Sequence, residues 1–386
     1  MSIQLPSTTA RMEADWDRVL VRMKQSRQPI QSHHQVSEVP RRHCAAAMPA
    51  SHRWGLVLAG GDGVRLRELT QPVWGADRPK QFCPVLGNST LLEDTRQRAE
   101  RSVPPGQILY SLTQAHEQYY LPILADRPAQ RIVQPSNKGT APAIFSALIH
   151  MAKRDPNAIV VILPCDHYYS PESAFTTTLE SAFEISEQRS SSVVLLGAEP
   201  KSPEVDYGWI EAGETIGRHS GLSQVGGFRE KPQLPVAEAL LREGALWNTF
   251  VMVGHVCTFL EMAWAAVPSL LQALESREVA LFPSGEIRIP DAVYDRIAPT
   301  DFSRQVLSTA THRLLALRLG NVEWSDLGDP YRVLTTILEK SGDLPSWARL
   351  WPGAPPAIQR AYSFRDGARF KIELHPYRSS PMSPFQ

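Results

Sequence analysis

A short apolar run that ends in a glycine-rich turn is the feature that most restricts how this chain can fold. Residues 54–58 (WGLVL) lead directly into residues 59–63 (AGGDG). Such a run indicates a buried β-strand, and the glycines allow the following loop to bend freely and turn its amide groups toward an anion. The pattern predicts a strand followed by a phosphate-binding loop, although the glycines alone would also fit an ordinary tight turn.

Two basic residues after this loop suit a nucleoside triphosphate. Arg65 offers a planar fork of donors, and Lys80, in the segment DRPKQF (77–82), offers a point charge. No Gly-Lys-Ser/Thr sequence follows the loop, so it is not a Walker loop, and the third glycine of the dinucleotide-binding fingerprint is missing. We therefore expect a triphosphate site of another kind.

The chain has no net charge, so any attraction for phosphate must come from local groups. Forty basic residues balance forty acidic ones in a chain of 386 residues, which predicts no nucleic-acid or membrane partner. No signal-peptide pattern and no apolar stretch of about 20 residues is present. The four cysteines (Cys44, Cys83, Cys165 and Cys257) show no zinc spacing. We expect reduced thiols and a cytoplasmic location.

Beyond residue 54, short β-type runs alternate with longer helical ones. Strands are expected at 107–111, 131–134, 158–163 and 192–198, and helices at 91–102, 140–153 and 172–188. This alternation predicts an α/β fold, a Rossmann-like mixed sheet with helices on both faces. Ligands in such sheets gather beyond the carboxyl ends of the strands, so we expect the 59–63 loop and the turn at 164–167 in one cleft.

The chain is predicted to have three parts. Residues 1–50 form an N-terminal extension, partly helical or flexible, that we expect to be dispensable for chemistry; residues 51–340 form the main domain; and residues 341–386 form a C-terminal tail rich in proline and basic residues. Within the main domain, residues 199–252 contain many turns and few helical patterns. We interpret this stretch as an inserted β-rich lobe that receives a second substrate.

The glycine loop, Arg65 and the PKQF segment together resemble the signature of sugar-1-phosphate nucleotidyltransferases, most closely the mannose-1-phosphate guanylyltransferase branch. The resemblance extends over roughly residues 54–340 and implies the nucleotide-diphospho-sugar transferase fold. It implies GTP and mannose 1-phosphate as substrates and is compatible with a homodimer. It also implies catalytic roles for Arg65 and Lys80, and nucleotide binding by the loop residues Ala59, Gly60, Gly61 and Gly63.

A second block, QPSNKGTAPA at 134–143, resembles the family segment beside the base and ribose. The resemblance implies nucleotide binding by Gln134, Asn137, Thr140 and Ala141. Gln134 stands where the branch usually has Glu, which bears on the choice of base. The alternative interpretation is a loop whose Thr140 caps the next helix, but a cap explains only one of these residues.

Three further blocks resemble the sugar side of the family: DYGWI at 206–210, FREKP at 228–232 and LWNTFVM at 246–252. The resemblance implies that sugar phosphate is bound by Gly208, Glu230, Lys231 and Asn248. Lys231 would meet the phosphate, and Glu230 would accept hydrogen bonds from ring hydroxyls. Phe250 occupies a position where the family has Gly, which bears on the identity of the sugar.

Two blocks, LPCDH at 163–167 and EWSDLG at 323–328, are similar to the metal side of the family. The resemblance implies that Asp166 and Asp326 bind Mg²⁺ and that Asp166 is catalytic. A carboxylate just after a buried strand suits Mg²⁺, which prefers hard oxygen ligands and keeps several waters. Taken singly, each Asp could instead be a helix cap.

The implied reaction needs no protein nucleophile. An ionised oxygen of the sugar 1-phosphate attacks the α-phosphorus and expels pyrophosphate, while the protein aligns the reactants and neutralises charge. Two alternatives remain open. One is the same reaction with another hexose 1-phosphate or base; the other is a non-catalytic paralogue that binds sugar nucleotides and regulates a partner. The complete charged set argues against the second alternative.

Overall fold

The computed structural model describes residues 51–74, 78–217, 221–275, 280–281, 285–345 and 347–348. The chain divides into two compact units. Among the described residues, unit 1 takes in residues 51–61, Asp94–Cys165 and Tyr169–Trp324, and unit 2 takes in Asp62–Glu93, Asp166–Tyr168 and the residues from Ser325 onward. The predicted N-terminal extension, and residues 346 and 349–386 of the predicted tail, lie outside the described residues.

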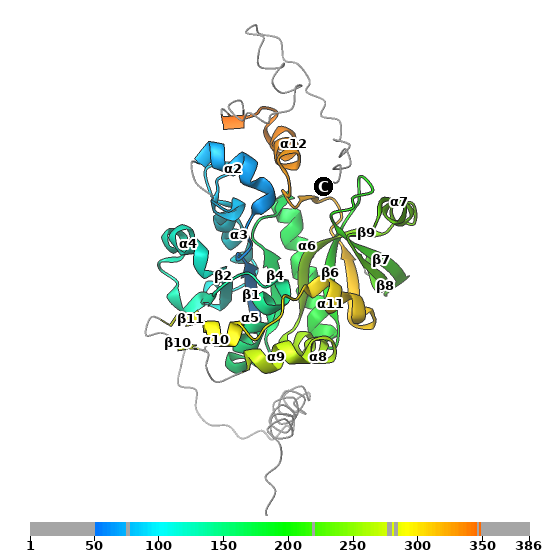
Figure 1. Cartoon of the computed structure of the whole chain (residues 1–386). Helices are drawn as coiled ribbons and strands as arrows, with labels where there is room; N and C mark the ends of the chain where they lie inside the picture. The colour runs from blue at the N-terminus through cyan, green and yellow to red at the C-terminus, as the bar shows by residue number, and fades with distance from the viewer. Residues whose placement is uncertain are drawn as a thin grey trace, which may run out of the picture. The chain divides into compact units, whose positions relative to one another are not determined.

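Unit 1 is built on one large mixed sheet (Figure 1). Its described strands number 11 and lie in the order β10-β11-β3-β2-β1-β4-β9-β6-β12-β8-β7. Their bounds are β1 Arg53–Leu58, β2 Ile108–Thr113, β3 Arg131–Gln134, β4 Ile159–Pro164, β6 Val193–Ala198, β7 Gly208–Thr215, β8 Leu222–Glu230, β9 Leu246–His255, β10 Ala280–Leu281, β11 Ile287–Arg288 and β12 Leu314–Arg318. β1 pairs in parallel with β2 and β4, whereas β9 runs antiparallel to β4 and β6. The predicted α/β class and the four predicted strands are confirmed.

Helices cover both faces of this sheet, as the sequence predicts. In unit 1 they are α4 Glu117–Leu124, α5 Thr140–Arg154, α6 Glu172–Gln188, α7 Leu234–Arg242, α8 Val256–Ala266, α9 Pro268–Leu274, α10 Asp291–Tyr294 and α11 Phe302–Gln305. Trp54 and Leu56 of β1 belong to one core cluster with residues of α5, α8 and α9. Arg53 stacks on Phe183 of α6. Because successive side chains of a strand point to opposite faces, α6 covers the other face.

The region expected to form a β-rich lobe contains β7, β8 and β9. These strands continue the large sheet, because β7 pairs with β8 and β9, and β9 in turn pairs with β4 and β6. The helix α7 connects β8 to β9. The predicted sugar-side residues therefore lie on strands of the main sheet or next to them.

Unit 2 has a smaller core of its own. Its elements include the 3₁₀ turns η1 Val64–Leu66 and η2 Lys80–Phe82 and the helices α2 Arg67–Trp74 and α12 Pro330–Ser341. The helix α3 (Leu91–Ala99) and the short paired strands β5 (Tyr168–Ser170) and β13 (Glu323–Ser325) have residues in both units. Leu344 and Ala348, at the start of the predicted tail, are buried in this core. The predicted domain boundaries stay predictions.

No single helix within the described ranges is long and apolar enough to cross a membrane. In the part of the chain that the structure describes, only α8 and α9 taken together reach that length and composition, and a bend of 119° separates them.

Glu275, at the carboxyl end of α9, gives unit 1 a testable dependence on pH. Burial raises the pKa of Glu275 from 4.5 to about 8 against the opposing charge of Lys153. Since the folded protein holds this proton more tightly than the unfolded chain does, the free energy of unfolding should fall as pH rises from about 4.5 to about 8. Glu275→Gln should remove this part of the slope, which urea unfolding at pH 5, 6.5 and 8 would measure.

His150 also makes the free energy of unfolding depend on pH, so the slope of the Glu275 variant must be compared with that of the wild type. Burial, with Arg154 and Lys153, lowers the pKa of His150 from 6.5 to about 4, so His150 favours the folded state increasingly as pH rises through that interval. This contribution is common to wild type and variant and cancels in the difference. Equal slopes for the two proteins would contradict the assignment to Glu275.

Candidate active site

The charged residues predicted for the triphosphate and the metal lie together in unit 2. The Nζ atom of Lys80 is 3.1 Å from Oδ2 of Asp166. It also donates hydrogen bonds to the main-chain oxygens of Asp326 at 2.6 Å and Leu327 at 3.0 Å. Only 8% of the Lys80 side chain is exposed. Three segments that are far apart in the sequence are thus joined through one buried ammonium group.

Local backbone geometry shapes the Asp326 segment. The amide of Gly328 donates to Oδ1 of Asp326 at 2.9 Å, and the amide of Leu327 donates to the hydroxyl of Ser325 at 3.2 Å. Leu327 adopts a left-handed backbone, with φ of 47°. This tight turn directs two successive carbonyl oxygens at Lys80.

Both carboxyl groups in this cluster are ionised. Burial would raise the pKa of Asp166, but the charges of Lys80 and His167 outweigh burial and lower it. Burial acts in the same way on Asp326, where Arg332, Lys80, His167 and Arg65 together lower the pKa. Arg332 lies 3.2 Å from Asp326 and Arg65 lies 3.6 Å from it. The cluster therefore holds two carboxylates at neutral pH.

The two carboxylates fit the protein's share of a Mg²⁺ site. The charge of Asp326 raises the pKa of Asp166, so the two carboxylates interact electrostatically. Among the described residues no three His, Cys, Asp or Glu side chains form a complete metal site. A complete cage is not required, because Mg²⁺ in nucleotide enzymes commonly takes one or two carboxylates and completes its shell with phosphate oxygens and waters.

The predicted phosphate loop begins in unit 1. The amide of Ala59 donates to the carbonyl of Ser111 at 2.9 Å, and the carbonyl of Gly60 accepts from the Thr113 hydroxyl at 2.8 Å. Gly60 and Gly61 complete the part of the loop in this unit. The strands β1 and β4 are parallel neighbours that end opposite each other, so this loop and Cys165 leave the sheet at the same edge.

The loop continues in unit 2 with Gly63, which has a left-handed backbone with φ of 59°. A Cβ atom at this position would lie 2.9 Å from the amide nitrogen of Lys80. Glycine is therefore required here both by the backbone conformation and by the close approach of the Lys80 segment.

Gln134 lies buried at the end of β3 and is held by the protein itself. Its Oε1 accepts from the Tyr294 hydroxyl at 2.6 Å, and its Nε2 donates to the Ser111 hydroxyl at 3.0 Å. Tyr294 is a residue that the sequence analysis missed, and no pattern in the sequence connects it with Gln134. The amide group of Gln134 thus supports the loop region from within.

The rest of this block contacts the segment 300–302. The amide of Ala141 donates to the carbonyl of Thr300 at 3.1 Å, and the Thr140 hydroxyl accepts from the amide of Phe302 at 2.8 Å. Asn137 accepts from the amide of Gly139 at 3.0 Å. The alternative interpretation of Thr140 as a cap is wrong, because Gly139 is the N-cap of α5 and Thr140 is already helical.

The predicted sugar-side residues lie close together in unit 1. Gly208 and Glu230 face each other across β7 and β8. A Cβ atom on Gly208 would lie 2.7 Å from Oε2 of Glu230 and 3.3 Å from Cβ of Asn248. The amide of Lys231 donates to the carbonyl of Tyr207 at 3.1 Å. The structure therefore brings Gly208, Glu230 and Asn248 together, with Lys231 next along the chain.

Backbone strain marks the same blocks. Among the described residues, the non-glycine residues with positive φ are Lys231 at 49°, Phe250 at 60° and Leu327 at 47°. Each belongs to a block that the sequence analysis singled out. Such conformations cost free energy and concentrate at functional sites, so the backbone supports the choice of these blocks independently of their side chains.

A comparison with protein families decides the family. The model for the family described as nucleotidyl transferase matches residues 54–338. The chain belongs to the nucleotidyl transferase family. This finding confirms the resemblance read from the glycine loop and the blocks that follow it.

Curated relatives of this nucleotidyl transferase are moderately similar. The xanthan biosynthesis protein XanB of Xanthomonas campestris pv. campestris is 29% identical over 225 residues, which cover 57% of this chain and 46% of that protein. The mannose-1-phosphate guanylyltransferase of Escherichia coli K12 is 26% identical over 318 residues, which cover 79% of this chain and 60% of that protein. The chain thus spans about half the length of these relatives.

Solved structures agree on the fold. A crystal structure described as mannose-1-phosphate geranyltransferase from Thermus thermophilus has a TM-score of 0.63 and 28% identity, and the match covers 75% of this chain and 79% of that one. One described as mannose-6-phosphate isomerase from Helicobacter pylori has a TM-score of 0.57 at 20% identity, covering 71% and 99%. The second supports the fold alone.

The close approach at Gly208 gives a prediction for this nucleotidyl transferase. In Gly208→Ala the new Cβ atom would displace the Glu230 carboxylate, so we expect the KM for the sugar phosphate to rise about tenfold, with the KM for the nucleotide unchanged. Gly106→Ala is the matched control, because a Cβ atom there meets nothing within 4 Å. Identical steady-state constants for Gly208→Ala and the control would contradict the role of Glu230.

Proposed function

We propose that this chain transfers a guanylyl group from GTP to mannose 1-phosphate, giving GDP-mannose and pyrophosphate. The observation that carries the proposal is the unit 2 cluster, in which the buried Lys80 ammonium contacts the ionised carboxylate of Asp166 and the main chain of a second ionised residue, Asp326. Such a cluster suits phosphoryl chemistry in a member of the nucleotidyl transferase family. The names of the relatives favour guanosine and mannose among the possible substrates.

The proposed reaction uses no covalent intermediate with the protein. An ionised phosphate oxygen of mannose 1-phosphate attacks the α-phosphorus of GTP, and the bond to the β-phosphate breaks as pyrophosphate leaves with the electron pair. Lys80 and Arg65 neutralise negative charge on the triphosphate as it builds up. Arg65 is suited to this role because its side chain is 57% exposed while it lies beside Asp326. Bound Mg²⁺, held by Asp166 and Asp326, would supply further positive charge to the phosphates.

The sugar phosphate is assigned to groups in unit 1. Lys231 binds the phosphate as a point charge. Glu230 accepts hydrogen bonds from ring hydroxyls, and Asn248 lies beside it. Burial and the Asp301 carboxylate raise the pKa of Glu230 against the opposing charges of Lys231 and Arg304. Sugar hydroxyls that donate to this carboxylate would favour its ionised form.

A second candidate keeps the reaction and changes the base. It is favoured by Gln134, whose carbonyl oxygen and amide nitrogen already bond to Tyr294 and Ser111. If the base is guanine, its selection must come from other groups near the start of α5, such as Asn137 or the amides of the loop.

The test is a matrix of nucleoside triphosphates against hexose 1-phosphates, scored by pyrophosphate release. We expect GTP with mannose 1-phosphate to give the highest kcat/KM. A clear preference for UTP, dTTP or ATP would contradict the guanylyl assignment, and a preference for another sugar would contradict mannose. A folded protein with no turnover for any pair would contradict the enzyme and favour the regulatory paralogue.

We propose that the enzyme is cytoplasmic, has no nucleic-acid or membrane partner, and is compatible with a homodimer. The balanced charge of the chain supports the absence of a nucleic-acid or membrane partner. The proposed boundaries, with an extension at 1–50, a nucleotidyltransferase domain at 51–340 and a tail at 341–386, are testable by deleting residues 1–48. The deletion should leave kcat within a few-fold.

A further inference from the structure

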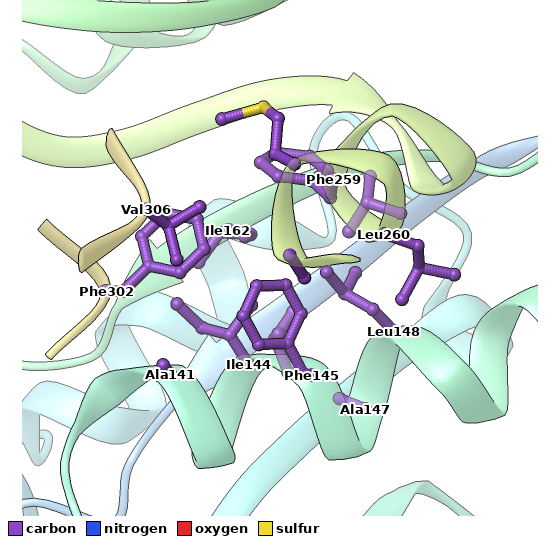
Figure 2. Close-up of a cluster of buried hydrophobic side chains, with 14 of the residues drawn as sticks. Ala141, Ile144, Phe145, Ala147, Leu148, Ile162, Phe259, Leu260, Phe302 and Val306 are labelled. Carbon is purple, nitrogen blue, oxygen red and sulfur yellow. The ribbon is translucent and has the colours of Figure 1, made fainter. Parts of the chain in front are cut away.

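The short helix α11 is fixed firmly in the core of unit 1. Phe302 and Val306, at its two ends, point into the cluster formed with Ala141, Ile144 and Phe145 of α5 (Figure 2). The Phe302 ring lies 5.6 Å from the ring of Phe145 and 6.2 Å from that of Phe250. A helix held from one side in this way presents the residues between its anchors at fixed positions.

The same helix lies between two predicted binding blocks of unit 1. On one side, Thr300 and Phe302 bond to Ala141 and Thr140 of the nucleotide block. On the other side, the Phe302 ring lies 6.2 Å from the ring of Phe250, in the sugar-side block 246–252. The helix α11 therefore contacts both blocks.

Arg304 is an exposed cation of α11 that the proposed reaction does not yet use. Its charge acts on Glu230, as does that of Lys231. Neither the Arg304 guanidinium nor the Lys231 ammonium forms an ion pair with any other residue that the structure describes. Asp301, the other carboxylate acting on Glu230, accepts from the amide of Arg304 at 2.8 Å and caps the helix.

Lys231 and Arg304 are cations whose charges act on one carboxylate, Glu230. Such a set suits a ligand that carries both phosphate and hydroxyl groups. A phosphate is bound most tightly by donors that are themselves charged, and the planar fork of Arg can offer it two hydrogen bonds. A carboxylate such as Glu230 accepts from hydroxyls but repels phosphate, so the cations must hold the phosphate and the carboxylate must hold the sugar.

We propose that Arg304 is a second phosphate-binding residue for the sugar 1-phosphate and acts together with Lys231. This inference rests on the proposed function and deepens it, because it assigns recognition of the sugar phosphate to α11 as well as to the Lys231 segment.

The test compares Arg304→Gln with Arg304→Lys and with the control Arg189→Gln. Arg189 is also exposed, but it follows α6 and precedes β6, at the amino end of that strand. We expect Arg304→Gln to raise the KM for mannose 1-phosphate about tenfold, in the range for loss of a hydrogen bond to a charged group, with the KM for GTP unchanged. Arg304→Lys should recover part of the loss because it restores the charge. Raising the salt concentration should increase the KM of the wild type more than that of Arg304→Gln.

The outcomes separate the two proposals. An active wild type whose constants match those of both Arg304→Gln and Arg189→Gln would overturn the role of Arg304 and leave the proposed function standing. An equal rise in the KM values for GTP and mannose 1-phosphate would also overturn it. A folded wild type that turns over no sugar 1-phosphate would overturn both. Thermal unfolding of Arg304→Gln should match that of the wild type, since the side chain is exposed.

Discussion

Replacing Lys80 by Met should lower kcat for nucleotidyl transfer about 10³-fold and also destabilise the protein. The Met side chain keeps most of the volume but removes the ammonium group that lies 3.1 Å from Asp166 and bonds to the carbonyls of Asp326 and Leu327. Loss of a preorganised cation aimed at developing charge costs about 10³-fold in kcat. Two ionised carboxylates would also lose their shared cation.

We expect the free energy of unfolding of Lys80→Met to fall by about 3 kcal/mol, at the lower end for breaking a buried ion pair, because Asp166 is 30% exposed. Lys340→Met is the matched control, since that exposed Lys in unit 2 donates to the carbonyl of Leu86. Its kcat and its free energy of unfolding should barely differ from those of the wild type. Steady-state kinetics and urea unfolding provide the two measurements. Normal turnover by Lys80→Met would remove Lys80 from the mechanism.

The second large effect concerns the carboxylates. Asp166→Ala and Asp326→Ala should each lower kcat by about 10²-fold or more, which is about 3 kcal/mol. The double variant should lose far less than the product of the single losses, because groups that act on one ion cannot be removed twice. The dependence of the remaining activity on Mg²⁺ concentration should shift in every variant.

A milder substitution separates charge from structure at Asp326. Asp326→Asn retains an oxygen that can accept from the Gly328 amide, yet it removes the charge that faces Arg332 and Arg65. It should fold like the wild type and still lose about 10²-fold in kcat. Independent losses in the double variant, or normal Mg²⁺-dependent activity in either single Ala variant, would rule out a shared metal site.

The strands of the sheet were predictable because burial on both faces leaves a continuous apolar run. Residues 159–163 (IVVIL) are buried throughout, and the predicted strands agree with β2, β3, β4 and β6 to within about two residues at each end, the usual uncertainty of such boundaries. Two-residue strands such as β10 and β11 carry no comparable pattern.

The motifs predicted that Lys80, Asp166 and Asp326 lie together, but they did not predict which atoms make the contacts. Lys80 bonds to two main-chain carbonyls, and main-chain acceptors leave no trace in residue identity. The geometry depends on the left-handed backbone of Leu327, a residue type that rarely adopts it.

The contacts of α11 were missed for a different reason. A helix of 4 residues is too short to show helical periodicity. Its bond to Thr140, and the bond of the preceding Thr300 to Ala141, join distant parts of the chain. The interpretation of Thr140 as a cap failed because the residue before it, Gly139, begins the helix with a positive φ of 96°. Propensity favours Thr as a cap but does not exclude Gly.

The central claim is that a phosphate oxygen of the sugar 1-phosphate attacks the α-phosphorus of the nucleotide. Incubating the protein with GTP, Mg²⁺ and mannose 1-phosphate labelled with ³²P in its phosphate tests this directly. The account predicts that the label appears in GDP-mannose and that the pyrophosphate released in equal amount carries none. Label recovered as inorganic phosphate, label in pyrophosphate, or no labelled nucleotide sugar from a folded protein would contradict it.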